Sequence, residues 1–434
     1  MTDPRYLAVK LLNKTFKGSS YSNIQLSHGL DSSDMSERDK KFCSALYYGV
    51  IERKITLDHI IGGLSSRPLS KLDDIIINIL RCGIYQLLYM ENVPDSAAVD
   101  ESVKLAKRFG KASASGMVNA VLRNFIRHEK VFPVPMDIIN SSSILYSAPV
   151  WLVERLCADY GLELMTNLLS DALEKPAVTI KMNSTRCTEA ELAASLENIT
   201  LTGSELLPDC YMLGGGDPVN TEAFKSGFFH VQDMASQLCC MALSPTENDL
   251  VLDICAAPGG KTFTMAEMMN GKGKIYAFDL HEKRVKLIRD GAQRLGLTNI
   301  IADCGDAAVY NPELPEFTKI LCDVPCSGIG AVRRKPEIKY KDEEDFSALP
   351  EIQYNIAHNA LNYLAVGGEL VYSTCTLRRA ENDEVVDRLL KNHPELEPVT
   401  LPEPLGEKFG CRASIFPCHF GSDGFFIAKF RKIK

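Results

Sequence analysis

The chain has 434 residues, of which 45% are hydrophobic and 24% charged, and its formal net charge at pH 7 is −8. This length predicts two or three domains, and the composition is typical of a soluble globular protein. The negative charge argues against a simple nucleic-acid-coating protein, and no apolar run reaches the roughly 18 residues of a membrane span, since the run 75–80 stops at Arg81.

The N-terminal segment lacks the charged start, apolar middle and small cleavage site of a signal peptide, so we expect a cytoplasmic protein. Fourteen cysteines occur without a C-x-x-C pair, and we expect reduced thiols. Cys322 and Cys326 are spaced C-x-x-x-C with no histidine nearby, so no metal site is predicted.

The first 130 residues show helical periodicity, with apolar residues three and four positions apart between Gly, Ser and Pro punctuation. This pattern predicts an all-α bundle with helices over 3–16, 36–64, 72–90 and 96–110.

Charge is unevenly distributed along the chain. Residues 1–130 hold 19 Lys and Arg against 14 Asp and Glu, a net charge of +5, which leaves −13 for 131–434. Residues 101–130 alone hold seven basic and two acidic residues. A basic end on an acidic protein suggests a local site for a polyanion, and a solvated helix face is the alternative.

A change of composition follows the bundle. Residues 131–151 are rich in Pro and Ser and read as a linker. Strand-like alternation over 177–185 and 228–233, with a helical pattern over 189–197 between them, then predicts a small α+β module.

Strands and helices alternate from residue 249 onward. The pattern predicts a doubly wound, mainly parallel sheet, whose ligands bind at the carboxyl ends of the strands. We expect strands over 249–254, 274–280, 319–325 and 367–376, helices over 282–296 and 351–364, and a final edge strand within 421–432.

The stretch "DICAAPGGKT" (253–262) joins a strand to a helix N-terminus, where backbone N–H groups attract anions. Its ending suggests a P-loop, but the first glycine of that motif would fall at Cys255. The dinucleotide fingerprint G-x-G-x-x-G also fails, because Gly259 and Gly260 are adjacent and the turn has no other glycine.

Acidic residues follow the later strands. Asp279 lies about twenty residues past the glycine turn, where a carboxylate can accept both hydroxyls of a ribose. Asp306 and Asp323 follow the next strands, and carboxylates there would repel the phosphates of a dinucleotide. These residues favour S-adenosyl-L-methionine, an adenosine without phosphates; a helix N-cap is the alternative for Asp279.

Two cysteines, Cys326 and Cys375, stand at further strand ends, in turns of small polar residues. A buried structural cysteine is the alternative, but a thiolate with a lowered pKa is a strong nucleophile, and Lys261 and the basic residues 333–335 could lower it. Addition of a thiolate to carbon-6 of a pyrimidine makes carbon-5 able to accept a methyl group. Methylation of an amino group needs no such nucleophile, and "DVPC" departs from the D/N-P-P-Y/F turn of those enzymes.

The motifs "DICAAPGGKT", "DVPCSGIGAVRRKPEIK", "YSTCTLRRAEN" and "DGFF" resemble those of the RNA 5-methylcytosine methyltransferases. The resemblance implies that Cys375 is the nucleophile, that Cys326 aids product release, and that Asp323 and Lys261 contact the cytosine. It implies a methyl-donor site made of Cys255, Ala256, Ala257, Pro258, Gly259, Gly260, Lys261, Asp279, Asp306 and Asp323.

The N-terminal segments "KFCSALYYGVIERKITLD" and "SAAVDESVKLAKRFG" with "GMVNAVLRNF" resemble the helical RNA-binding domain of NusB. The segments "APVWLVERL" and "GFFHVQDMASQL" resemble connecting segments of the bacterial RsmB (Sun/Fmu) group within the RsmB/NOP family. The resemblance covers nearly the whole chain and implies S-adenosyl-L-methionine-dependent methylation of one cytosine of 16S rRNA.

The implied architecture has three domains. They are an all-α NusB-like bundle over 1–135, a linker with a small α+β (RRM or ferredoxin-like) module over 136–232, and a Rossmann-like methyltransferase domain with a mainly parallel seven-stranded sheet over 233–434. The expected partner is 16S rRNA, free or in an early small-subunit particle, with no membrane and no obligate protein partner.

Two alternatives belong to other functional classes. A non-catalytic RNA-binding or antitermination factor would need neither the cysteine pair nor the acidic strand ends. A methyltransferase for a small molecule or a protein would leave the basic helical domain without a purpose.

Overall fold

The computed structural model describes residues 2–18, 22–196 and 198–434. Contacts divide the chain into two compact units. The helical unit consists of Met1–Glu174 with Val332–Lys341, and the sheet unit of Lys175–Ala331 with Asp342–Lys434. Within the described ranges, no helix is long and apolar enough to cross a membrane.

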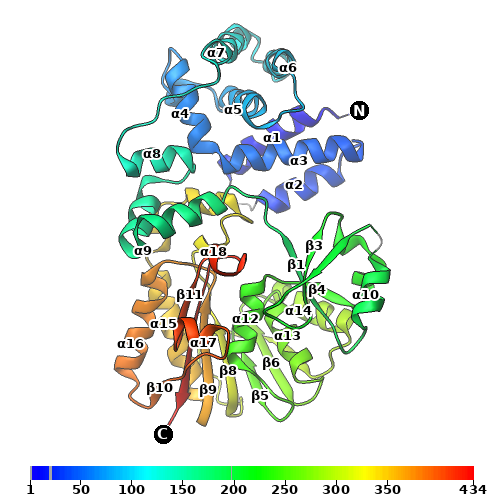
Figure 1. The fold of residues 1–434 in the computed structure, drawn as a ribbon, viewed down its shortest axis with the longest axis vertical. Coiled ribbons are helices and arrows are strands. Elements are labelled where there is room, and N and C mark those ends of the chain that lie inside the picture. The colour runs from blue at the N-terminus through cyan, green and yellow to red at the C-terminus, as the bar shows by residue number, and fades with distance from the viewer. Residues whose placement is uncertain (1, 19–21, 197) are drawn as a thin grey trace. The chain divides into compact units, whose positions relative to one another are not determined.

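The helical unit is an all-α bundle, as expected (Figure 1). The helix predicted over 36–64 is two helices, because the backbone breaks at Arg53, which has φ −106° and ψ 16°. Neither Gly nor Pro stands next to Arg53, so the sequence pattern does not predict this break. The helices are α1 (Pro4–Lys17), α2 (Ser22–Asp31), α3 (Glu37–Glu52), α4 (Lys54–Leu64), α5 (Asp74–Tyr89), α6 (Asp95–Arg108), α7 (Ser115–Arg127), α8 (Ile138–Leu145) and α9 (Val150–Asp171).

The Pro- and Ser-rich stretch 131–151, expected to be a linker, contains α8 and packs within the bundle. The Thr56 hydroxyl donates to the Ile144 carbonyl at 2.5 Å, and the Ile55 N–H donates to the Ser147 hydroxyl at 2.9 Å. Ser147 therefore supplies a hydrogen bond to the bundle, and the Pro- and Ser-rich composition was a misleading signal of a linker.

The segment Val332–Lys341 is anchored in the helical unit although it lies far along the chain. Glu337 accepts hydrogen bonds from the backbone and hydroxyl of Ser22, and the Tyr340 hydroxyl donates to the Ile51 carbonyl at 2.7 Å. Lys339 is 1% exposed, and burial lowers its pKa to about 7. The segment is thus held by buried polar contacts that its basic composition does not suggest.

The sheet unit begins with a four-stranded antiparallel sheet of order β2-β3-β1-β4. The strands over 178–182 and 229–231 were expected, and the other two were not. The helices over 189–195 and 222–225 pack Leu192 and Ala223 into the core of this sheet. Of the helix predicted over 189–197, residue 197 lies outside the described residues. The elements are β1 (Val178–Met182), α10 (Glu189–Ser195), β2 (Thr200–Gly203), β3 (Cys210–Gly214), α11 (Glu222–Lys225) and β4 (Phe229–Val231).

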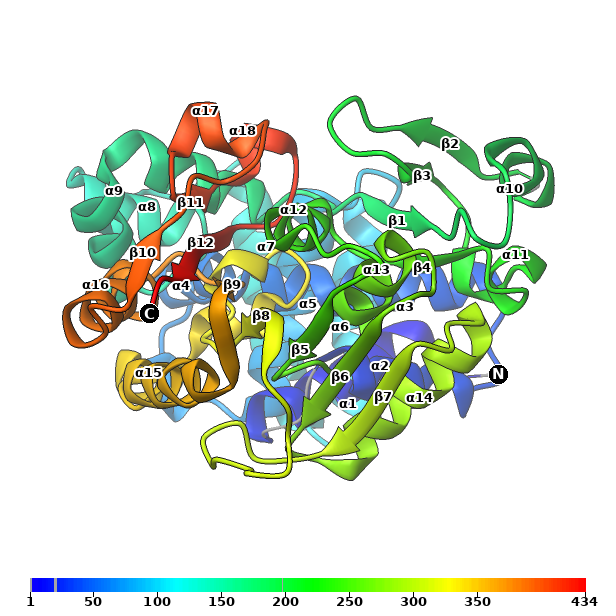
Figure 2. The same cartoon turned by 90° about the horizontal axis from the view of Figure 1, so that it is seen from below.

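The larger sheet has the order β10-β12-β9-β8-β5-β6-β7, and the five strands from β9 to β7 are parallel (Figure 2). Apolar residues of its two faces alternate: Val251 faces α12, α13 and α14, and Leu252 faces α15 and α16. The elements are α12 (Met234–Leu243), β5 (Leu250–Asp253), α13 (Gly260–Met268), β6 (Lys274–Asp279), α14 (Glu282–Leu295), β7 (Ile300–Cys304), β8 (Phe317–Asp323), α15 (Leu349–Ala360), β9 (Leu364–Thr374), α16 (Asp383–Asn392), β10 (Leu396–Pro398), α17 (Leu405–Phe409), β11 (Arg412–Ile415), α18 (Pro417–Phe420) and β12 (Phe425–Lys432).

The final strand β12 was expected at the sheet edge, and this prediction is wrong. β12 pairs with β9 on one side and with β10 and β11 on the other, so that β11 adds an eighth strand to the expected seven in the described part of the sheet. Both covering strands are short: β10 has three residues and ends in Pro398, and the alternation of β11 extends over only four residues, so neither gives a strong strand signal.

Glu369 in β9 stabilises the sheet from within a cluster of three cations. Its carboxylate lies 2.6 Å from Lys319, 3.0 Å from Lys429 and 2.9 Å from Arg431, and its side chain is 11% exposed. Burial alone would raise its pKa, but the hydrogen bonds from these cations outweigh it and lower the pKa to about 2.

Replacing Glu369 with glutamine is expected to lower the free energy of unfolding at pH 7 by about 2–3 kcal/mol. The contribution of the carboxylate to the free energy of unfolding is complete above pH 4.5, the pKa of this group in the unfolded chain, and is lost as the pH falls toward 2. Urea denaturation followed by circular dichroism measures the loss. Glu397→Gln is the matched control, since Glu397 is 46% exposed and 3.6 Å from Arg431; equal losses in both variants would refute the prediction.

Candidate active site

The glycine turn after β5 is held in one conformation by its own backbone and by Phe263. Gly259 has φ 110°, and a Cβ at this position would lie 2.4 Å from the Phe263 ring, so only glycine fits. The Ala256 N–H donates to the Phe278 carbonyl at 2.7 Å, and the Thr262 hydroxyl donates to the Asp253 carboxylate at 2.7 Å. The turn therefore presents the N-terminus of α13 in a fixed geometry.

Asp279 ends β6 and is 3% exposed. Its carboxylate accepts a hydrogen bond from the His281 N–H and lies 2.8 Å from Arg284 Nη1. The N-cap of α14 is His281, so the N-cap alternative for Asp279 is wrong. Arg284 also donates from Nη2 to the Ala257 carbonyl at 2.8 Å, which ties the glycine turn to this carboxylate.

A cavity of about 270 Å³ lies beyond β7, beside Asp306. Its walls include the rings of Phe278 and Tyr310 and the side chain of Leu314. The Asp306 carboxylate accepts a hydrogen bond from the Ala308 N–H at 2.9 Å. Flat apolar walls beside acidic strand ends fit a nucleoside, with its base in the cavity and its ribose hydroxyls toward a carboxylate.

Lys261, Asp323 and Ser373 form one hydrogen-bonded cluster. Lys261 Nζ lies 2.7 Å from Asp323 Oδ2, and the Ser373 hydroxyl donates to Asp323 Oδ1 at 2.8 Å. Burial alone would lower the Lys261 pKa, but the Asp323 charge outweighs it and raises the pKa well above its usual range. Lys261 is therefore a permanent cation that presents hydrogen-bond donors beside the turn.

Cys326 and Cys375 are brought together, with their sulfur atoms 3.0 Å apart. They follow neighbouring parallel strands, in which Asp323 of β8 pairs with Ser373 of β9. The hydrogen bond to Cys375, together with burial, raises the pKa of Cys326 well above its usual range. The two sulfur atoms therefore share a hydrogen bond, and one thiol donates to the sulfur of the other.

Glu381 and Asn382 support both cysteine turns, a role that sequence reasoning missed. The fully buried Glu381 carboxylate accepts hydrogen bonds from the Ser327 N–H at 2.8 Å and from Gln353 Nε2 at 2.9 Å. Asn382 Oδ1 accepts from the Thr374 hydroxyl at 2.6 Å. The available signal for these two residues was an acidic and an amide residue five and six positions after Thr376. Arg284, five positions after Asp279, was also missed.

The predicted residues follow the parallel strands β5, β6, β7, β8 and β9, so the structure brings them to the same edge of the sheet, at the carboxyl ends of these strands. Lys261 pairs with Asp323, a contact that the sequence did not predict. The basic stretch 333–335 was expected to lower the pKa of a cysteine thiol. Its Arg333 forms an ion pair with Asp171 of the helical unit, 3.2 Å away.

Comparison with known proteins identifies each part of the chain. Residues 240–431 match the family model "16S rRNA methyltransferase RsmB/F", residues 2–127 match the NusB family, and residues 148–220 match the RsmF/B-like ferredoxin-like domain. Over 444 aligned residues, the chain is 38% identical to the probable ribosomal RNA small subunit methyltransferase B of Bacillus subtilis, covering 99% of both chains. This chain belongs to the RsmB family.

Further relatives agree with this assignment. Ribosomal RNA small subunit methyltransferase B of Escherichia coli O1:K1 is 30% identical over 92% of both chains. The crystal structure of PH0851 has a TM-score of 0.83 at 22% identity, covering 100% of this chain and 99% of that one. A methyltransferase homologue from Pyrococcus horikoshii has a TM-score of 0.59 at 28% identity, covering 67% and 97%. The predicted family and fold class are confirmed, and the chain is an S-adenosyl-L-methionine-dependent 16S rRNA methyltransferase.

Proposed function

We propose that this RsmB-family enzyme methylates carbon-5 of a cytosine in 16S rRNA through a covalent bond between Cys375 and carbon-6 of the base. The observation that carries the proposal is the cysteine pair, whose sulfur atoms lie 3.0 Å apart beside Lys261 and Asp323. A methyltransferase acting on an amino group would need neither thiol.

The methyl-donor site follows from the acidic strand ends. S-adenosyl-L-methionine supplies an electrophilic methyl group when it is bound. Backbone N–H groups of Gly260 and Lys261, at the N-terminus of α13, attract its carboxylate, Asp279 accepts hydrogen bonds from the ribose hydroxyls, and the cavity beside Asp306 takes the adenine. Asp323 borders both this site and the cytosine, to which Lys261 donates a hydrogen bond.

Cys375 acts as the nucleophile. Its thiolate adds to carbon-6 of the cytosine, and the electron pair of the 5,6 double bond is displaced so that carbon-5 becomes enamine-like. Lys261 and Asp323 hold the polar edge of the base, which orients carbon-6 toward the sulfur. Carbon-5 then bonds the methyl group, whose bond to the donor's sulfur breaks and leaves S-adenosyl-L-homocysteine. Carbon-5 now carries both the new methyl group and its original proton.

Cys326 acts in product release. Before addition, its hydrogen bond to Cys375 is the largest cause of its raised pKa. Once the Cys375 sulfur is bonded to carbon-6, it no longer takes part in that hydrogen bond in the same way, and Cys326 can lose its proton to water. Its thiolate then accepts the carbon-5 proton, the double bond re-forms, and Cys375 leaves.

Nucleoside analysis tests the site of methylation. 16S rRNA incubated with the enzyme and isotopically labelled S-adenosyl-L-methionine is digested and separated by liquid chromatography with mass spectrometry. We expect the label in 5-methylcytidine. Label in N4-methylcytidine or in a methylated adenosine would refute the proposal.

We propose that the helical unit binds the rRNA backbone. Lys107, Arg123 and Arg127 on α6 and α7 are exposed, and replacing all three with alanine is expected to weaken RNA binding about tenfold and to flatten its salt dependence. Filter binding over a range of salt concentrations measures both effects. The control removes three exposed lysines of the sheet unit, Lys225, Lys272 and Lys286; an equal loss there would contradict a specific role of α6 and α7.

A further inference from the structure

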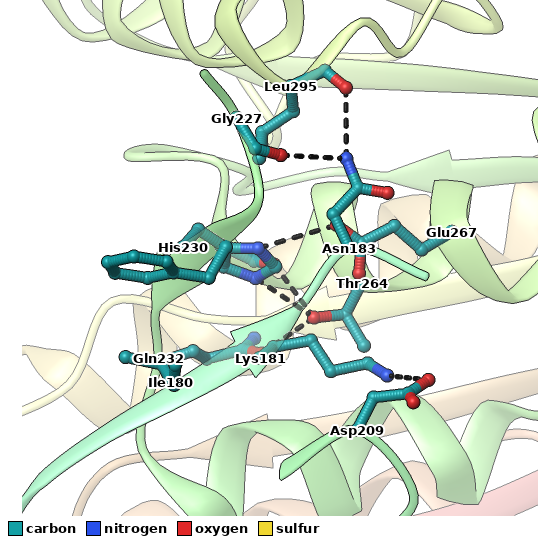
Figure 3. Close-up of polar contacts among 12 residues, drawn as sticks. Ile180, Lys181, Asn183, Asp209, Gly227, His230, Gln232, Thr264, Glu267 and Leu295 are labelled. Carbon is teal, nitrogen blue, oxygen red and sulfur yellow. Dashed lines mark hydrogen bonds and ion pairs between the residues drawn. The ribbon is translucent and has the colours of Figure 1, made fainter. Parts of the chain in front are cut away.

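A buried polar network connects the four-stranded sheet to α13. It consists of His230 in β4, Gln232 just after it, and Thr264 and Glu267 in α13, and each of the four is at most 6% exposed (Figure 3). We call it the His230 network. Burying four polar side chains where apolar residues could pack is unfavourable unless they are paired.

The hydrogen bonds of the network fix the ring of His230. The Thr264 hydroxyl donates its proton to Gln232 Oε1 at 2.6 Å. His230 Nε2 lies 3.2 Å from Thr264 Oγ1 and therefore donates to this hydroxyl oxygen. His230 Nδ1 then faces Glu267 Oε1 at 3.5 Å, and among the described residues neither atom has a hydrogen-bond partner. The imidazole is therefore oriented between Thr264 and Glu267, with Nε2 toward the hydroxyl and Nδ1 toward the carboxylate.

The network reaches the glycine turn along two routes. Thr264 Oγ1 lies 3.2 Å from the Gly260 carbonyl. The His230 ring packs edge-on against the Phe263 ring, with centroids 5.7 Å apart, and the Phe263 ring fills the space next to Gly259. Displacing His230 would therefore release both residues that brace the turn.

We propose that His230 and Glu267 are positioning residues that hold the glycine turn in the conformation that binds the methyl donor. The contact between their side chains fixes the imidazole, which braces Phe263 and Thr264 and thereby the N–H group of Gly260 at the start of α13. This inference rests on the proposed assignment of the turn to S-adenosyl-L-methionine. Neither side chain touches the donor.

Two substitutions of Glu267 separate positioning from packing. In Glu267→Gln a polar group of nearly the same size still faces His230 Nδ1, and its amide can donate to that atom, so S-adenosyl-L-methionine should bind within about twofold of wild type. Glu267→Leu leaves Nδ1 without a partner, and binding should weaken about tenfold while the affinity for rRNA stays unchanged. Glu247→Gln, at a carboxylate 45% exposed, is the control and should have no effect.

Isothermal titration calorimetry with S-adenosyl-L-methionine in the absence of RNA measures the affinity, and hydrogen exchange of peptides spanning 255–264 measures the order of the turn. We expect faster exchange in Glu267→Leu and near-normal exchange in Glu267→Gln. If His230→Phe combined with Glu267→Met binds the donor as wild type does, the network is merely structural and the inference fails. If the wild-type protein itself does not bind the donor, the proposed function fails instead.

Discussion

Replacing Cys375 with serine is expected to lower the rate of 16S rRNA methylation by about 10³-fold or more, because a hydroxyl is a far weaker nucleophile than a thiolate. Serine has nearly the volume of cysteine, and the turn stays anchored by the Gly330 N–H, which donates to the carbonyl of residue 375. Transfer of tritium from labelled S-adenosyl-L-methionine to rRNA measures the loss.

The control for this variant is Cys418→Ser, since Cys418 is exposed and lies outside the proposed site. It should methylate rRNA at the wild-type rate. S-adenosyl-L-methionine should bind normally to both variants. Near-normal methylation by Cys375→Ser would contradict the role of Cys375 as the nucleophile.

Replacing Cys326 with serine is expected to trap the enzyme on its RNA. Addition of Cys375 needs no group from Cys326, so the covalent bond still forms and the methyl group is still taken up. A hydroxyl cannot replace the thiolate as the base for the carbon-5 proton, so we expect turnover to fall about 100-fold. Denaturing electrophoresis of enzyme mixed with labelled 16S rRNA should then show a protein–RNA adduct.

The adduct must depend on the nucleophile. The double variant Cys326→Ser with Cys375→Ser should give no adduct, and wild type should give little, because release is fast. An adduct that persists in the double variant would come from another residue. An adduct formed by Cys375→Ser alone would mean that the two cysteines have exchanged roles.

The grouping of the proposed site residues was predictable because they follow strands. Parallel strands bring their carboxyl ends to one edge, so Asp279, Asp323, Cys326 and Cys375 could be grouped from the sequence pattern alone. Their hydrogen bonds could not, since the contact of Lys261 with Asp323 joins residues far apart in the chain and has no periodic signal.

Other features depend on long-range packing that local pattern does not encode. Glu381 lies in a short turn that reads as an exposed charge, yet it is fully buried because Ser327 and Gln353 donate to it. The interior place of β12 depends on β10 and β11, two short strands that the sequence pattern did not predict. The Ser-rich composition of α8 did not predict a helix. In each case tertiary hydrogen bonds decided the local structure.

The central claim, methylation of carbon-5 through a Cys375 adduct, is tested most directly by release of the carbon-5 hydrogen. 16S rRNA transcribed with [5-³H]cytidine is incubated with the enzyme and unlabelled S-adenosyl-L-methionine, and tritium is counted in the water. We predict one tritium released per methyl group transferred by the wild-type enzyme and none by Cys375→Ser. Methyl transfer without tritium release would contradict the account.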